Sequence, residues 1–162
     1  LVLHSPMAPH SLLMKVWNEM ETIQRAGGAR QLGISNCYNT ETMRQLYADA
    51  NVKPAVVQNR FYQETGYDAD LRNWCSSHGV IYQSFWTLTA NPHILGSNTV
   101  LTIAQKYNKT GAQIFFRYLS QSSIVPLTGT CSEQHMREDL SIFDFELSSD
   151  DLKNVSRLLN IV

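Results

Sequence analysis

Cysteine is scarce in this sequence, and long apolar runs are absent. Cys37, Cys75 and Cys131 lie far apart, and no C-x-x-C pair occurs. We therefore expect no metal site and no disulfide framework, and a reducing location such as the cytoplasm. No apolar stretch approaches the roughly 20 residues that a membrane-spanning helix needs, so no membrane span is expected either.

The sequence also lacks an excess of basic or of acidic residues. The 162 residues carry 13 basic and 14 acidic side chains, which gives a net charge of −1 at pH 7. Nucleic acids bind clustered basic surfaces, and since no such cluster is visible, nucleic acid is not expected as a partner. Hydrophobic residues make up 43% and charged residues 17% of the chain, as is typical of one globular domain.

The chain begins with residues typical of the middle of a strand, and not with an initiator methionine. Leu1, Val2 and Leu3 are apolar and directly precede His4. We therefore expect a fragment whose N-terminal part is missing. An organelle targeting signal is left open for the same reason.

Short β-branched runs alternate with amphipathic helical stretches along the whole chain. The first helix, predicted from Ser11 to Ala26, places Leu13, Trp17, Met20 and Ile23 on one buried face. Five strands are expected, at residues 1–5, 30–35, 55–61, 80–85 and 123–127, the first of them buried. The later helices are expected at 40–50, 68–77, 100–107 and 112–121, from 132, and after a capping box at 148–151.

Strands that alternate with helices at intervals of about 30 residues predict a parallel sheet of the α/β class. A doubly wound sheet would usually carry a G-x-G-x-x-G turn after a strand, and this sequence has none. A (β/α)8 TIM barrel has eight strand–helix units in about 250 residues. Five such units in 162 residues therefore predict a partial TIM barrel.

His4 follows the first predicted strand, and such strand ends form the rim where barrel enzymes hold their active sites. An imidazole there can donate a hydrogen bond to a carbonyl oxygen that gains negative charge during reduction. The alternative is a histidine that is buried and hydrogen-bonded for structural reasons. The residue alone does not decide between them.

The other strand ends are polar or aromatic as well. Ser35, Asn36 and Gln58 carry neutral hydroxyl and amide groups that suit a carboxamide ligand, although such residues also cap ordinary loops. Phe85 and Trp86 offer an aromatic face to a flat ring, or they fill the core.

Six short motifs in order resemble those of the aldo-keto reductase family. They are Leu3–Pro6, Leu32–Asn36, Lys53–Asn59, Thr110–Ile114, Val125–Thr128 and Phe143–Leu147. The resemblance covers essentially the whole chain and implies that residues 1–162 form the C-terminal part of a single TIM-barrel domain, strands four to eight with their helices. It further implies an NAD(P)H-dependent oxidoreductase that reduces aldehyde or ketone carbonyls to alcohols.

The resemblance also implies roles for individual residues. His4 would be the catalytic histidine that orients a small-molecule carbonyl substrate. Ser35, Asn36 and Gln58 would hold the nicotinamide carboxamide of NADP(H) or NAD(H), and the ring would stack on Phe85, so that these side chains converge around one ring. The remaining cofactor contacts would be Trp86, Thr87 and Leu88 at the pyrophosphate, and Thr128, Gly129, Thr130, His135, Glu138 and Asp139 at the adenosine.

Two departures from the family pattern concern the cofactor. Members that prefer NADPH usually carry Lys-Ser where this chain has Leu127-Thr128, and an arginine where His135 stands. Arg137 is the one cation nearby in the sequence and is the expected substitute. The resemblance therefore supports the use of a nicotinamide cofactor more strongly than it supports NADP(H) over NAD(H).

Two other functions fit the same pattern. A non-catalytic, reductase-like subunit would use the fold as a scaffold in a larger assembly, and would lack the family's tyrosine or lysine, which lie upstream of this sequence. A phosphate-handling aldolase or isomerase would carry a glycine-rich turn near the last two strands, where only Gly129 is found.

Overall fold

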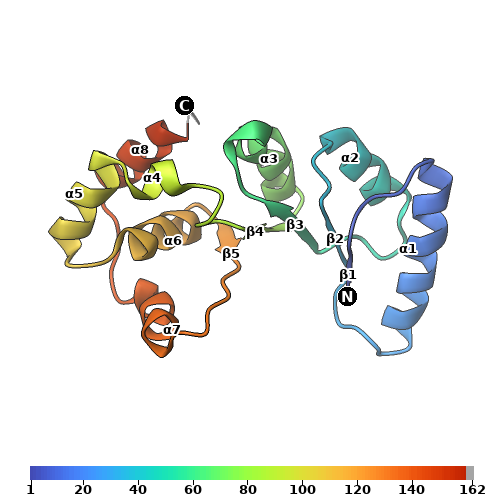
Figure 1. The fold of residues 1–162 in the computed structure, drawn as a ribbon. Coiled ribbons are helices and arrows are strands. Elements are labelled where there is room, and N and C mark those ends of the chain that lie inside the picture. Colours follow the sequence, from blue (N-terminus) through green and yellow to red (C-terminus); the bar gives the residue numbers. More distant parts are fainter. Residues whose placement is uncertain (160–162) are drawn as a thin grey trace. The chain divides into compact units, whose positions relative to one another are not determined.

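The computed structural model describes residues 1–159, in which five strands form one sheet in the order β1-β2-β3-β4-β5 (Figure 1). The strands are β1 (Val2–Leu3), β2 (Gly33–Ser35), β3 (Val56–Arg60), β4 (Ile81–Phe85) and β5 (Ile124–Pro126). β1 pairs with β2, and β2 with β3, in parallel. Each strand lies beside its neighbour in the sequence, which confirms the predicted parallel sheet with helical crossovers.

Helices occupy the connections between the strands, as predicted. The α-helices are α1 (His10–Arg25), α2 (Thr40–Asp49), α3 (Ala69–Ser77), α4 (Pro92–Leu95), α5 (Asn98–Tyr107), α6 (Gly111–Gln121), α7 (Glu133–Leu140) and α8 (Ser149–Leu158). Two 3-10 helices, η1 (Gln63–Asp68) and η2 (Ser141–Phe143), complete the elements.

The chain divides into two compact units, which are described separately below. Unit 1 consists of Leu1–Arg60 and Asp68–Gln83, and unit 2 consists of Phe61–Tyr67 and the chain from Ser84 onward. Strand β4 contributes residues to both units.

Strand β1 of unit 1 is shorter and more exposed than predicted. Only Val2 and Leu3 pair with β2, and the side chains of Leu1 and Val2 are 51% and 40% exposed. The prediction of a buried strand was therefore wrong. β1 is an edge strand, so it has a paired neighbour on one side only within the described residues.

Helix α1 of unit 1 buries Leu13, Trp17 and Met20 as predicted. Ile23 departs from the predicted face and is 46% exposed. The chain turns back at this point, because the backbone N–H of Gly28 donates to the carbonyl oxygen of Ile23 at 2.9 Å. A Cβ at Gly28 would lie 2.9 Å from the Ile23 side chain, so this close turn requires glycine.

The carboxylate of Glu21 ties α1 to the turn after α2. It is fully buried and accepts the backbone N–H groups of Asn51 and Val52 at 2.8 and 3.0 Å. It also accepts hydrogen bonds from the side chains of Asn51 and Arg25 at 3.2 and 3.1 Å. Burial raises the pKa of Glu21, but these hydrogen bonds and the Arg25 charge outweigh it, and the pKa is lowered overall.

A second buried polar group joins the strands of unit 1 to α3. Asn59 Oδ1 accepts the backbone N–H of Cys37, and Asn59 Nδ2 donates to the carbonyl oxygen of Cys37, both at 2.9 Å. The Asp68 carboxylate accepts hydrogen bonds from Asn59 Nδ2 at 2.8 Å and from the Tyr82 hydroxyl at 2.7 Å.

Burial, followed by the negative charge of Asp68, raises the pKa of Cys37 to about 12. Burial also raises the pKa of Cys75 to about 12, with smaller contributions from Cys37 and Asp68.

Unit 2 is built around α6, which is buried along most of its length. Thr110 and Gln113 form a complete capping box at its N-terminus. The capping box predicted at Ser148 is only half formed. Ser148 accepts the backbone N–H of Asp151, while the Asp151 carboxylate binds groups of α5 instead of the backbone of Ser148.

Asp151 therefore links α8 to α5, and its replacement is expected to destabilise the protein. Its carboxylate accepts from Lys106, Tyr107 and Ser148 at 2.7, 2.8 and 2.6 Å. Burial raises its pKa, but hydrogen bonds from Lys106, Ser148 and Tyr107 outweigh this and lower the pKa to about 2. Relative to the ordinary value of 3.8, that shift corresponds to about 2 kcal/mol of stability at neutral pH.

We expect Asp151→Asn to lower the free energy of unfolding by about 2 kcal/mol at pH 7, as measured by urea unfolding. Because the folded pKa is lowered, this contribution is present above pH 4 and is lost as the pH falls from about 4 to 2. The wild type and Asp151→Asn should therefore converge in acid. Asp150→Asn, which changes the exposed neighbour, is the control, and an equal effect there would contradict the assignment.

No helix within residues 1–159 is long and apolar enough to cross a bilayer.

Candidate functional site

The ends of β1, β2 and β3 bring four predicted residues of unit 1 together. The register places Ser35 beside Gln58, and the Ser35 hydroxyl donates to the Gln58 carbonyl oxygen at 2.7 Å. The backbone N–H of Asn36 donates to the same oxygen at 3.1 Å, and Asn36 Nδ2 donates to the carbonyl oxygen of His4 at 2.8 Å. His4, Ser35, Asn36 and Gln58 thus share one edge of the sheet.

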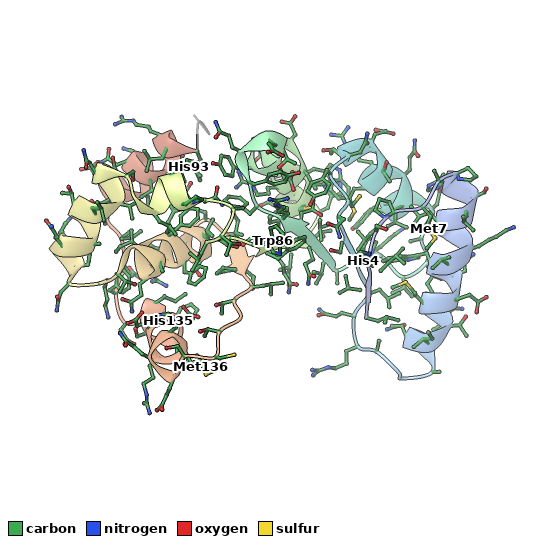
Figure 2. All side chains as sticks on the ribbon, in the orientation of Figure 1. His4, Met7, Trp86, His93, His135 and Met136 are labelled. Atoms are coloured by element: carbon green, nitrogen blue, oxygen red, sulfur yellow. The ribbon has the colours of Figure 1, made fainter. Side chains whose placement is uncertain are left out.

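The His4 side chain is exposed where the chain leaves β1 (Figure 2). Its imidazole makes no hydrogen bond within the described residues, although its backbone carbonyl is held by Asn36. Within residues 1–159 the His4 side chain is therefore exposed, and its role in catalysis stays a prediction. Both ring nitrogens are open to a ligand at this edge.

A pair of glutamine amides crosses from β3 to β4 in unit 1. Gln58 Nε2 donates to Gln83 Oε1 at 3.1 Å. The remaining carbonyl of Gln58 and the remaining NH2 of Gln83 make no further hydrogen bond within the described residues. The pair thus keeps one acceptor and one donor group, the two kinds of group that a carboxamide can bind.

Gln83 was missed by the sequence analysis, and so was Tyr38. The Tyr38 hydroxyl donates to Asn36 Oδ1 at 3.3 Å and accepts the backbone N–H of Arg60 at 3.2 Å, which fixes the Asn36 amide. Asn36 itself has a left-handed φ of 53°. A polar residue inside the otherwise largely apolar and aromatic run 80–85 was the available signal for Gln83.

Unit 2 contains a cavity of about 460 Å³. Its lining residues come from the loops after β4 and β5 and from α6, and none of them is charged. They are Trp86, Thr87, Leu88, Thr89, Phe116, Leu127, Thr128 and Gly129. Five residues predicted for the cofactor therefore line one cavity: Trp86, Thr87, Leu88, Thr128 and Gly129.

The loop on the β4 side of the cavity is held by buried polar groups. Thr87 Oγ1 donates to Ser84 Oγ at 2.9 Å, and Asn91 Nδ2 donates to the carbonyl oxygens of Thr87 and Phe61 at 2.9 and 2.7 Å. Trp86 has a left-handed φ of 55° and is 58% exposed (Figure 2). A rigid backbone thus presents a large aromatic side chain at the cavity.

The remaining predicted residues of unit 2 lie behind the β5 side of the cavity. Thr128 Oγ1 donates to Asp139 Oδ2 at 2.8 Å, and Thr130 Oγ1 lies 3.5 Å from His135 Nδ1. The carboxylate of Glu138 accepts from Gln134 Nε2 at 2.8 Å. These contacts place α7 directly against the loop that lines the cavity.

Three features of unit 2 differ from expectation or stay open. Arg137, the expected substitute cation, is bound to Glu133 at 2.6 and 3.1 Å. Thr89 and Phe116 line the cavity but were not predicted. For Phe116 the reason is that periodicity does not reveal which apolar face of a buried helix borders a cavity. Phe85 is half-buried at the end of β4, and its stacking on a nicotinamide ring stays a prediction.

Comparison with known proteins identifies relatives by sequence. No family model matches the chain. The chain is 29% identical over 147 residues to aldose reductase B of Dictyostelium discoideum, covering 90% of this chain and 47% of that protein. It is 30% identical over 142 residues to glyoxal reductase of Bacillus subtilis (strain 168), covering 88% of this chain and 50% of that protein.

Solved structures give the same result for the fold. An aldo-keto reductase of the silkworm Bombyx mori superposes with a TM-score of 0.84 and 28% identity, covering 96% of this chain and 52% of that one. The aldo-keto reductase complexed with NADPH gives a TM-score of 0.83 and 26% identity, covering 96% of this chain and 52% of that one. The chain spans about half the length of the curated relatives it matches. The predicted resemblance is thereby confirmed: over about half the length of its members, this chain is related to the aldo-keto reductase family and shares the parallel sheet of its barrel.

Proposed function

We propose that this chain forms the nicotinamide-binding part of an NAD(P)H-dependent reductase that converts small aldehydes or ketones to alcohols. Two relatives, aldose reductase B and glyoxal reductase, and the complex of an aldo-keto reductase with NADPH support this class of reaction. The observation that carries the proposal is the uncharged polar edge of unit 1. Hydroxyl and amide groups converge there beside an exposed imidazole.

The nicotinamide end of the cofactor would be held by the amides of this edge. Within residues 1–159 the side-chain carbonyl of Gln58 and the NH2 group of Gln83 make no further hydrogen bond, and an uncharged acceptor and donor of this kind suit a carboxamide. Asn36 is held by Tyr38 and by the His4 carbonyl, so its orientation is set before a ligand arrives. This donor set therefore fits a carboxamide group.

The carbonyl of the substrate would be oriented by His4. When bound, the nicotinamide would supply the hydride for the carbonyl carbon, and the proton for the oxygen would come from the tyrosine that the family resemblance places outside this sequence. The exposed imidazole of His4 donates a hydrogen bond to the carbonyl oxygen as that oxygen becomes negative, which stabilises the transition state more than the ground state.

The cavity of unit 2, considered by itself, would accept a pyrophosphate or adenosine group. Its volume of about 460 Å³ lies within the usual range for small-molecule sites. Trp86 offers a flat aromatic surface there, and Thr89 and Thr128 offer hydroxyl groups. We also propose a cytoplasmic location, since the cysteines of the chain are unpaired and free thiols persist in reducing compartments.

Titration of the intact protein with NADH and NADPH, followed by nicotinamide fluorescence, tests the proposal. We expect the wild type to bind the cofactor. We expect Gln58→Leu to bind it about tenfold more weakly, because this variant loses a hydrogen bond to the ligand and leaves Gln83 without its partner. Gln45→Leu, an exposed position on α2, is the matched control. If neither cofactor binds, the reductase proposal fails and a scaffold role is favoured.

A further inference from the structure

A groove of about 580 Å³ lies between α2 and α3 of unit 1. The two helices pack against each other (Figure 1), and both walls of the groove belong to the same unit. The lining residues are Thr40, Glu41, Arg44, Asp70, Asn73, Trp74 and Ser77. None of them belongs to the strand ends that form the candidate site.

The lining of this groove is polar, whereas packed helices usually bury apolar stripes between them. On α3 the lining residues recur from Asp70 to Ser77 at the spacing i, i+3, i+4 and i+7, so they share one face of the helix. An amphipathic helix docks through apolar anchors, and Trp74 is the single large apolar side chain in this lining. The groove therefore favours a polar ligand over a docked helix.

Several polar groups of the lining are not used by the protein itself. The side chains of Arg44, Asp70 and Asn73 are exposed and make no hydrogen bond or ion pair within residues 1–159. The same holds for the indole N–H of Trp74. Guanidinium and indole N–H groups donate hydrogen bonds, a carboxylate accepts them, and an amide does both. The groove therefore offers both donors and acceptors to one ligand.

The indole of Trp74 is held in place by two aromatic neighbours. Its ring stacks on His78, with 4.2 Å between the ring centroids and 21° between the ring planes. The Tyr47 ring meets the indole edge-on, with the centroids 5.3 Å apart. Trp74 is half-buried, so a rigid aromatic surface borders the groove, and little side-chain freedom is lost when a ligand binds there.

The distribution of charge indicates the class of ligand. Glu41 and Arg44 lie on the α2 wall and Asp70 lies on the α3 wall, so neither wall nor the groove as a whole is basic. An anion would meet two carboxylates, and a cation would meet the Arg44 guanidinium. A neutral molecule with many hydroxyl groups can instead pair each hydroxyl with a donor or an acceptor.

We propose that the groove between α2 and α3 binds a neutral saccharide. Arg44, Asp70 and Asn73 hydrogen-bond to its hydroxyl groups, and Trp74 packs against the apolar C–H face of one sugar ring. The volume of about 580 Å³ lies within the usual range for small-molecule sites. The inference is independent of the proposed function, because no residue of the groove takes part in the proposed reduction.

The test measures the binding of three non-reducing saccharides, trehalose, sucrose and methyl β-glucopyranoside, to the intact protein by saturation-transfer NMR. These probes have no free carbonyl, so they are not substrates for reduction. We expect saturable binding of at least one probe with a dissociation constant below about 10 mM. Asp70→Ala and Arg44→Ala should each weaken this binding at least about tenfold, because a hydrogen bond to a charged group is lost. Glu19→Ala, at an exposed position of α1, should leave it unchanged.

Two further measurements separate binding from folding and locate the ligand. The variants at Asp70 and Arg44 should unfold in urea at the same midpoint as the wild type, because both side chains are exposed and lack partners in residues 1–159. The bound saccharide should change the tryptophan fluorescence of the protein. This change should be lost in Trp74→Phe and kept in Trp86→Phe.

Three results would overturn the inference. The first is a lack of saturable binding of all three probes up to about 100 mM. The second is binding that stays unchanged in both folded variants, Asp70→Ala and Arg44→Ala. The third is tighter binding of glycine, a dipolar ion, or of spermidine, a cation, at this groove than of any of the saccharides. The titration with NADH and NADPH decides the proposed function separately.

Discussion

Replacing His4 by alanine is expected to lower kcat/KM for the reduction of a small aldehyde by the intact protein by about 100-fold or more. The imidazole is exposed at the end of β1 and makes no hydrogen bond within the described residues, so its removal leaves the sheet edge intact. Its proposed contact strengthens as the carbonyl oxygen gains charge, and the loss should therefore appear in kcat. Steady-state kinetics with saturating cofactor measures this effect.

Three comparisons make the His4 prediction specific. The dissociation constant of the cofactor should be unchanged in His4→Ala, because the proposed amide contacts come from other strands. His4→Gln keeps a hydrogen-bond donor and should recover part of the activity. His10→Ala changes a histidine of the same unit whose ring hydrogen-bonds to Asp49 at 2.8 Å, and its activity should be near that of the wild type. A loss below threefold in His4→Ala would remove His4 from the reaction.

Glu21→Ala is expected to cause the largest loss of stability, about 3 kcal/mol or more in the free energy of unfolding. The substitution leaves the buried backbone N–H groups of Asn51 and Val52 without their acceptor. Trp17 gives a local readout, because its indole N–H donates to the carbonyl oxygen of Val52 at 3.0 Å. Urea unfolding measures the global effect, and tryptophan fluorescence in a background that carries Trp74→Phe and Trp86→Phe measures the local effect at Trp17.

The pH dependence separates charge from packing at Glu21. Its folded pKa is lowered, so the stabilisation by the charged form is complete above about pH 4.5 and is lost as the pH falls through the folded pKa. The stability difference between the wild type and Glu21→Gln should therefore shrink in acid. Glu19→Ala, at an exposed position of the same helix, should change the free energy of unfolding by less than about 0.5 kcal/mol.

The Gln58→Leu variant removes a contact proposed for the nicotinamide end of the cofactor. NADH and NADPH share this end, so the variant should weaken the binding of both equally.

Local signals in the sequence predicted most of the fold. The spacing of Leu13, Trp17 and Met20 identified the buried face of α1, and Ser132 correctly marked the start of α7. The exposure of β1 was not predictable, because an apolar run does not reveal whether a strand has neighbours on both sides. The partners of Asp151 were equally hidden, since Lys106 and Tyr107 lie more than 40 residues away in the chain.

The candidate site was predictable where it follows strand ends, and less so elsewhere. Ser35 and Gln58 follow from the rule that parallel strands end at one edge of a sheet. Gln83 lies within a strand, and its pairing with Gln58 depends on the register between β3 and β4. Phe116 borders the cavity from α6, in which every residue from Gln113 to Leu119 is buried, so the apolar pattern does not mark the residue that faces the cavity.

The burial of two thiols in unit 1 has a practical consequence for labelling chemistry. Alkylating reagents react with the thiolate, and a pKa of about 12 keeps Cys37 and Cys75 protonated at neutral pH. Cys131 is exposed in the loop that leads from the cavity to α7. A maleimide dye would therefore attach there ahead of the other two positions, and the native sequence already offers a handle for following ligand arrival by fluorescence.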